Sequence, residues 1–252
     1  MLCLYAMQVT RLDWWQSFYE QNPEPREWFC GIDDALKELQ RNVADLGPST
    51  RVLHIGCGTS ELPFELLARY GTGSFNIDYS PQAIEHMSKR GTERIRFALA
   101  DARDLTDCKD QSFDVVLDKG TMDCLALVNA QGTEFVRALN EFHRILIADG
   151  KVLVFSLFPL SDRSAALKMV EFAWSWEEHA MDCAPLEQPD QEHLFLHVFT
   201  KRTVDVVLDS AMQSMGSPDV NVATAAGTPG VPGPLVQPST SKAHSDRVPA
   251  EA

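Results

Sequence analysis

The chain has 252 residues, of which 44% are hydrophobic and 23% are charged, a composition that is ordinary for a globular protein. Its length permits one domain with extensions or two small domains. Its formal net charge of −14 argues against binding of nucleic acid through a basic face. No apolar run approaches the roughly 18 residues that a membrane helix needs, and the first residues do not resemble a signal peptide. We therefore expect no nucleic-acid partner and no membrane partner, and we also expect a monomer, although the sequence itself does not show the oligomeric state.

Six cysteines occupy positions 3, 30, 57, 108, 124 and 183, with no CxxC pair. Close cysteine pairs are typical of zinc ribbons, so we expect no metal site. The spacing also does not resemble the disulfide framework of a small secreted protein. We interpret the cysteines as reduced thiols and expect a cytoplasmic protein, with a mitochondrial location as the alternative.

Short apolar runs alternate along the chain with segments whose apolar residues recur at helical spacing. In chain order, we predict one or two aromatic-rich helices within 13–40, a strand at 51–55, a helix at 61–70, a strand at 74–78, a helix at 80–90, strands at 95–101 and 113–118, a helix at 132–146 ended by Asp149-Gly150, and strands at 151–158 and 193–202. Ser80 can cap its helix, and Pro81 suits the first helical position. This alternation predicts an α/β fold with a doubly wound, mostly parallel sheet and helices on both faces.

The C-terminal part of the chain differs in composition from the rest. No aromatic residue follows Phe199, and prolines and glycines interrupt any hydrophobic period from Met215 onward. Such a segment buries too little apolar surface to fold. We therefore expect an N-terminal helical segment at 1–48, a core domain at 49–202 and a disordered tail at 203–252.

Glycines or acidic residues follow four successive predicted strands. In order, these positions are Gly56-Cys57-Gly58, Asp78, Asp101-Ala102 and Asp118-Lys119-Gly120. The carboxyl ends of parallel strands meet at one edge of a sheet, where open α/β proteins bind ligands. Glycines there bring a ligand close to backbone N–H groups, and an acid at the position of Asp78 can accept hydrogen bonds from a ribose. Each position alone also suits a tight turn or a helix cap, but the set predicts a site for a nucleoside-containing cofactor.

The first glycine turn favours S-adenosylmethionine over a dinucleotide. A pyrophosphate is typically bound by GxGxxG, but this chain has Glu61 at the third glycine position. A negative charge beside a pyrophosphate is unfavourable, whereas Asp118 and Asp123 suit the positive sulfonium of S-adenosylmethionine. A nicotinamide-dependent dehydrogenase is the less favoured alternative.

The segments VLHIGCGTSELP, NIDYSPQAI, LADARDL and FDVVLDKGTMD resemble class I S-adenosylmethionine-dependent methyltransferases. More narrowly, GCGTS, DYSP and DKGT-x-D resemble the methyltransferase-like family that includes the lysine methyltransferases of elongation factor 1-alpha and of mitochondrial citrate synthase. The resemblance covers about 14–202 and implies a seven-stranded Rossmann-like methyltransferase sheet. It implies that N-terminal aromatics cover the cofactor and that the cofactor is bound by Trp15, Tyr19, Trp28, Gly56, Gly58, Asp78, Tyr79, Asp101, Ala102, Asp118 and Lys119.

The same resemblance implies methyl transfer to a lysine side chain of a protein, such as a translation factor or a metabolic enzyme. Two features depart from the family: His54 stands where many class I enzymes have an acid, and 174–199 follows the family only loosely, in a region that helps to select the substrate. A small-molecule methyltransferase and a non-catalytic S-adenosylmethionine-binding protein are the alternative functions.

A lysine must lose a proton before it attacks, and Asp118 and Asp123 are the candidate catalytic residues that would orient or deprotonate it. Asp123 suits a helix cap equally well, and a structural ion pair with a neighbouring acid is the favoured role for Lys119.

Overall fold

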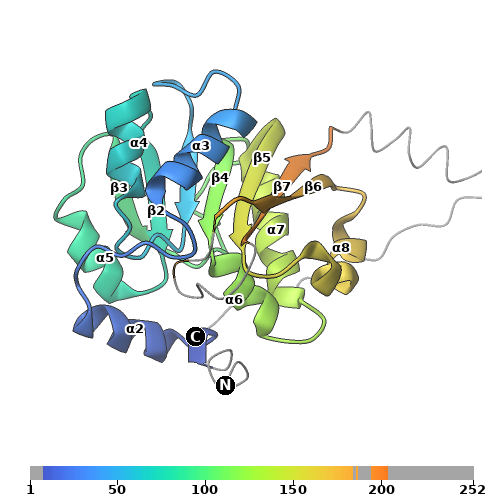
Figure 1. Cartoon of the computed structure of the whole chain (residues 1–252), viewed down its shortest axis with the longest axis horizontal. Coiled ribbons are helices and arrows are strands. Elements are labelled where there is room, and N and C mark those ends of the chain that lie inside the picture. Colours follow the sequence, from blue (N-terminus) through green and yellow to red (C-terminus); the bar gives the residue numbers. More distant parts are fainter. Residues whose placement is uncertain (1–7, 184–185, 187–193, 204–252) are drawn as a thin grey trace, which may run out of the picture. The chain divides into compact units, whose positions relative to one another are not determined.

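The computed structural model describes residues 8–183, 186 and 194–203, and Figure 1 shows a sheet covered by helices on both faces. The seven strands follow the order β3-β2-β1-β4-β5-β7-β6. They are β1 (Val52–Ile55), β2 (Ser74–Asp78), β3 (Ile95–Leu99), β4 (Phe113–Lys119), β5 (Leu146–Ser156), β6 (Trp174–Met181) and β7 (Leu194–Lys201). β7 pairs antiparallel with β5 and with β6, and the other neighbouring pairs of this sheet are parallel. The predicted doubly wound, mostly parallel α/β fold is confirmed.

The helices of the described residues are α2 (Leu12–Gln21), α3 (Ile32–Asn42), α4 (Leu62–Tyr70), α5 (Pro81–Ser88), α6 (Thr121–Leu127), α7 (Thr133–Ile145), the 3₁₀ helix η1 (Leu160–Arg163) and α8 (Ser164–Val170). α5 begins as predicted, because the Ser80 hydroxyl accepts a hydrogen bond from the Ala83 N–H and Pro81 is the first helical residue. α7 buries the predicted stripe that includes Phe135 and Phe142.

Each face of the sheet has its own hydrophobic core, because successive strand side chains point to opposite faces. In β5, Val152 and Val154 belong to the core under α7 and α8, whereas Leu153 and Phe155 belong to the core under α3 and α4. The two helical layers lie on opposite faces (Figure 1). Burial on both faces explains why the central strands read as continuous apolar runs.

The boundary between α7 and β5 differs from the prediction. α7 ends at Ile145, so Asp149 and Gly150 lie inside β5 rather than after the helix. Leu146 pairs with Phe113, and the register shifts before the following pairs. Asp149 adopts a left-handed φ of 59°, which accommodates this irregularity within the strand. The short helices α6, η1 and α8 were not predicted, because one or two turns carry too few residues to show a helical period.

The order of the strands reverses between β1 and β4, because the chain proceeds from β1 to β2 and β3 and then returns to the other side of β1. The carboxyl ends of these strands point toward α2 and α6 (Figure 1). This is the position at which open α/β sheets bind ligands. None of the helices within the described ranges is long and apolar enough to span a membrane.

The predicted division of the chain into segments stays a prediction. α2 and α3 lie in the described part of the N-terminal segment at 1–48. The predicted tail lies, from residue 204 onward, outside the described residues.

Candidate active site

A cavity lies at the carboxyl ends of β1, β2 and β4, at the reversal of strand order. Its wall is formed by segments at the ends of five strands, β1 to β5, together with α6 and the N-terminal region. The predicted residues that line it are Trp15, Tyr19, Trp28, Gly56, Asp78, Tyr79, Asp101, Ala102, Lys119 and Asp123. Gly58 and Asp118 do not line it. Ten of the twelve predicted site residues therefore line one cavity.

Asp78 is the buried acid of this wall. Its carboxylate accepts a hydrogen bond from the Gly58 N–H at 2.8 Å and another from the Ser80 N–H at 2.8 Å. Burial raises the pKa of Asp78 to about 6. Each carboxylate oxygen retains acceptor capacity beyond these two bonds, so the group can still bind hydroxyls in the cavity. Gly58 thus contributes to the site by orienting Asp78 rather than by lining the cavity.

The glycine turn permits two close approaches that no other residue would allow. Gly56 has a φ of 54°, and a Cβ atom there would lie 1.7 Å from the Thr121 hydroxyl oxygen. Gly58 has a φ of 49°, and its Cβ would lie 2.3 Å from the Tyr19 hydroxyl oxygen. The turn therefore brings α6 and α2 against the same loop.

After β3, the predicted residues Asp101 and Ala102 are accompanied by an arginine that the sequence analysis missed. Arg103 lines the cavity and pairs with Asp101 at 2.6 Å and with Glu134 of α7 at 2.6 Å. These pairs fix the loop after β3 to α7, while Ala102 is buried against the core.

Asp118 lies behind the wall of the cavity rather than in it. Its side chain is fully buried, and its carboxylate accepts hydrogen bonds from the N–H groups of Gly120, Thr121 and Met122 at 3.4, 2.9 and 3.2 Å. Burial and the nearby Asp123 carboxylate raise the pKa of Asp118 to about 7. The carboxylate satisfies backbone donors at the start of α6 and so stabilises that helix terminus.

Lys119 lines the cavity and also forms the predicted ion pair. Its partner is Glu27, whose carboxylate additionally accepts hydrogen bonds from the Ser60 hydroxyl and the Glu61 N–H, both at 2.8 Å. The Lys119 side chain is 4% exposed and the Glu27 side chain 16%. Glu27 thus joins the N-terminal segment, the glycine turn and β4 at one point. No local signal in the sequence identified Glu27, because its partners are distant in the chain.

Asp123 lines the cavity but does not cap a helix. Its carboxylate accepts hydrogen bonds from the Ser156 hydroxyl at 2.7 Å and the Leu157 N–H at 2.9 Å, and it forms a buried ion pair with Arg163. The Arg163 guanidinium also lies 3.4 Å from a ring nitrogen of buried His197. This network joins α6, the end of β5 and η1, and it keeps Asp123 paired with a permanent cation.

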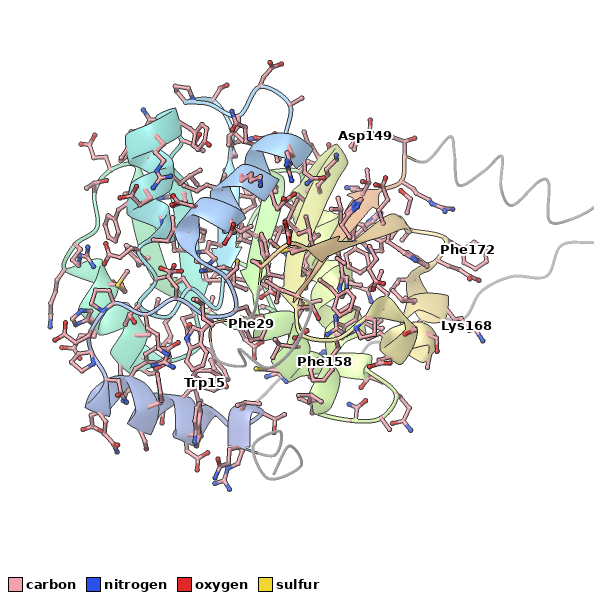
Figure 2. All side chains as sticks on the ribbon, viewed as in Figure 1. Trp15, Phe29, Asp149, Phe158, Lys168 and Phe172 are labelled. Carbon is pink, nitrogen blue, oxygen red and sulfur yellow. The ribbon has the colours of Figure 1, made fainter. Side chains whose placement is uncertain are left out.

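Aromatic residues cover the cavity from the N-terminal side. Trp15 stacks on Tyr19 with ring centroids 5.8 Å apart and meets Trp28 edge-on at 5.4 Å. Phe29 was not predicted; it has a left-handed φ of 67°, and its ring packs directly over Gly120. Phe158, also missed, lines the wall after β5, and both phenylalanines lie on the side of the sheet where β4 leads into α6 (Figure 2). A strained, buried Phe29 in the wall is typical of functional sites.

Across the residues that the structure describes, no group of three His, Cys, Asp or Glu side chains is arranged to hold a metal ion. Five cysteines in these ranges have free thiols. Burial raises the pKa of the Cys57 and Cys124 thiols, so both are held protonated.

This combination of a doubly wound sheet, a glycine turn after β1 and an acid at the end of β2 is typical of α/β proteins that bind nucleoside-containing cofactors. A family model described as "Methyltransferase domain" matches residues 46–180, more than half of the chain. The chain therefore belongs to the methyltransferase domain family, as the sequence motifs indicated.

Individual relatives agree with this assignment. A zebrafish (Danio rerio) protein named eEF1A lysine and N-terminal methyltransferase is 29% identical over 203 residues, which cover 78% of this chain and 29% of that protein. The mouse (Mus musculus) EEF1A lysine methyltransferase 4 is 30% identical over 158 residues, which cover 58% of this chain and 60% of that protein. The chain thus spans less than two thirds of the length of either relative.

Among solved structures, the N-methyltransferase NodS from Bradyrhizobium japonicum is similar to this chain with a TM-score of 0.50 at 17% sequence identity. The match covers 66% of this chain and 94% of NodS. At this identity the similarity establishes the fold.

Proposed function

We propose that the protein transfers a methyl group from S-adenosylmethionine to a lysine side chain of a protein, with the translation factor eEF1A as the first acceptor to test. The observation that carries the proposal is the cavity at the strand-order reversal, in which the glycine turn and buried Asp78 face an aromatic N-terminal wall. The names of the zebrafish and mouse relatives support the choice of acceptor.

The residues of the cavity fit this cofactor. Gly56 lines the cavity with backbone atoms alone, and Asp78 offers a buried carboxylate with acceptor capacity to spare for ribose hydroxyls. Tyr79 and Ala102 line the same cavity as Asp78 and would contact an adenine ring. When bound, S-adenosylmethionine supplies an electrophilic methyl group on a positively charged sulfur.

The remaining residues position the acceptor and exclude water. The Asp123 carboxylate already accepts from three donors, the Ser156 hydroxyl, the Leu157 N–H and Arg163, so it is suited to orient an amine rather than to take its proton. Two other groups are also unsuited to take the proton. The Asp118 carboxylate accepts hydrogen bonds at the start of α6, and burial raises the pKa of Tyr79, which keeps its hydroxyl protonated. We propose that the lysine loses its proton to water before it attacks, and that the aromatic wall then shields the reacting amine.

The proposal includes a cytoplasmic monomer. Free thiols at five described cysteines are consistent with a reducing compartment. The formal net charge of −14 suits a basic protein surface as partner better than nucleic acid.

Calorimetric titration of S-adenosylmethionine and of its demethylated product into the full chain tests the cofactor. We expect micromolar binding that Asp78→Asn weakens strongly and that Asp107→Asn, a matched change at an exposed acid outside the cavity, leaves unchanged.

Transfer of a labelled methyl group to purified eEF1A, followed by mass spectrometry of the modified residue, tests the acceptor. Absence of binding by the folded protein would refute the methyltransferase proposal. Binding without transfer to eEF1A or to any protein of a cell lysate would refute the lysine acceptor and favour a small-molecule acceptor or a non-catalytic role.

A further inference from the structure

A second cavity adjoins the candidate active site. Its volume is about 210 Å³, larger than the ~150 Å³ that holds a benzene molecule inside a protein. Asp123, Leu127 and Phe158 belong to the walls of both cavities. The two cavities are therefore neighbours, and a side chain next to one bound in the first would lie close to the second.

The second cavity exists because small side chains enclose it. The connection between α6 and α7 contributes Ala130 and Gly132, and α8 contributes Ala165 and Ala166. Gly132 has a φ of 65°, and a Cβ atom there would lie 3.0 Å from the Ala166 methyl group. Larger residues at these positions would fill the space that the alanines and the glycine leave open.

The second cavity carries one negative charge without a partner among the described residues. Its charged lining residues are Asp123, Asp162 and Arg163. Asp123 and Arg163 form a buried ion pair, so their charges offset each other. Asp162 is exposed and takes part in none of the ion pairs found within the described ranges. The remainder of the wall is apolar and includes the Phe135 ring.

We propose that the second cavity binds a basic side chain, arginine or lysine, which lies near the acceptor lysine in the protein substrate. The aliphatic stem of such a side chain would contact Leu127 and Phe158, and its cationic end would pair with Asp162. Charge complementarity and the lining residues shared with the first cavity support this occupant. Asp162 would repel an acidic side chain. A purely apolar side chain would displace water from the Asp162 carboxylate without offering it a hydrogen-bond donor, which is unfavourable. The inference rests on the proposed function, because it names how a protein substrate is selected.

Short peptides test the proposal with two separate readouts. Each peptide has one central lysine in an alanine background, and an arginine or a glutamate is placed in turn at each neighbouring position. Binding to the full chain with bound S-adenosylhomocysteine is measured by fluorescence anisotropy, and methyl transfer is measured with labelled S-adenosylmethionine. We expect arginine at one or two positions to tighten binding about fivefold relative to alanine.

Three variants identify the residue responsible. Asp162→Asn should abolish the preference for arginine, and Ala165→Phe should abolish it by filling the cavity from an exposed position. Glu171→Gln removes the same charge from an exposed acid that lines neither cavity, and it should retain the preference. Thermal unfolding of each variant confirms that it is folded.

The outcomes separate this inference from the proposed function. If the wild type binds arginine and alanine peptides equally, or if Asp162→Asn keeps the preference, the second cavity does not select a basic residue. An arginine preference in binding without methyl transfer supports the cavity and contradicts the lysine methyltransferase proposal. Methyl transfer without any arginine preference supports the enzyme and overturns the inference.

Discussion

The ion pair between Glu27 and Lys119 offers a direct test of how the N-terminal segment is held to the core. Glu27→Gln keeps the shape of the side chain and its capacity to accept from Ser60 and Glu61, so the change removes mainly the charge. The ammonium of Lys119, with 4% of its side chain exposed, then has no ionic partner among the described residues. Loss of one partner of a buried pair destabilises proteins by about 3–5 kcal/mol, and the retained hydrogen bonds favour the lower end.

We therefore expect Glu27→Gln to reduce the free energy of unfolding by about 3 kcal/mol, which lowers Tm by about 6–12 °C in a domain of this size. The cofactor should also bind more weakly, since Trp28 and Phe29 follow Glu27 directly in the cavity wall. Urea denaturation and calorimetric titration measure the two effects.

A double variant distinguishes the charge from the shape of the pair. Glu27→Gln with Lys119→Met removes the unpaired ammonium, so most of the lost stability should return. Glu20→Gln, at an exposed acid of α2, is the matched control and should stay within about 0.5 kcal/mol of the wild type. The reasoning is wrong if Glu27→Gln behaves like this control, or if the double variant is as unstable as the single one.

Three further changes have defined outcomes. Burial raises the pKa of Asp78 to about 6, so its carboxylate becomes protonated as the pH falls through that value. Calorimetry should therefore show cofactor affinity dropping about tenfold per pH unit below pH 6. In Asp78→Asn, which has no carboxylate to titrate, the affinity should not change over the same pH range. Gly56→Ala places a Cβ atom 1.7 Å from the Thr121 hydroxyl oxygen, so urea denaturation should show a loss of several kcal/mol in the free energy of unfolding. Gly31→Ala should be tolerated, because its φ is not positive and the nearest atom, an Asp34 carboxylate oxygen, would lie 3.7 Å from the new Cβ. Asp118→Ala leaves two buried N–H groups and one partly buried N–H group at the start of α6 without this acceptor, and it should reduce the free energy of unfolding by about 1–3 kcal/mol. Unchanged stability would contradict the capping role.

The sequence by itself determined six of the seven strands, because apolar runs and helical periods are local patterns that can be recognised without knowledge of neighbours, whereas β6 was not predicted. It also located one wall of the site. Gly56 and Asp78 lie at strand ends, and the carboxyl ends of parallel strands meet at one edge whatever the details of packing. The predicted ion pair of Lys119 followed from the high free energy of an unpaired buried charge.

Only the tertiary structure decided which strand-end acids face the cavity. Asp78 and Asp118 look alike in the sequence, yet Asp118 is used by the backbone of α6, a helix too short for its period to be seen. The partners of Lys119 and Asp123 lie 92 and 40 residues away in the chain. Such pairs form because folding brings distant elements into contact, and no local propensity encodes them. The second cavity has the same origin, since it is a space left between α6, α7 and α8 that exists only once those helices have packed.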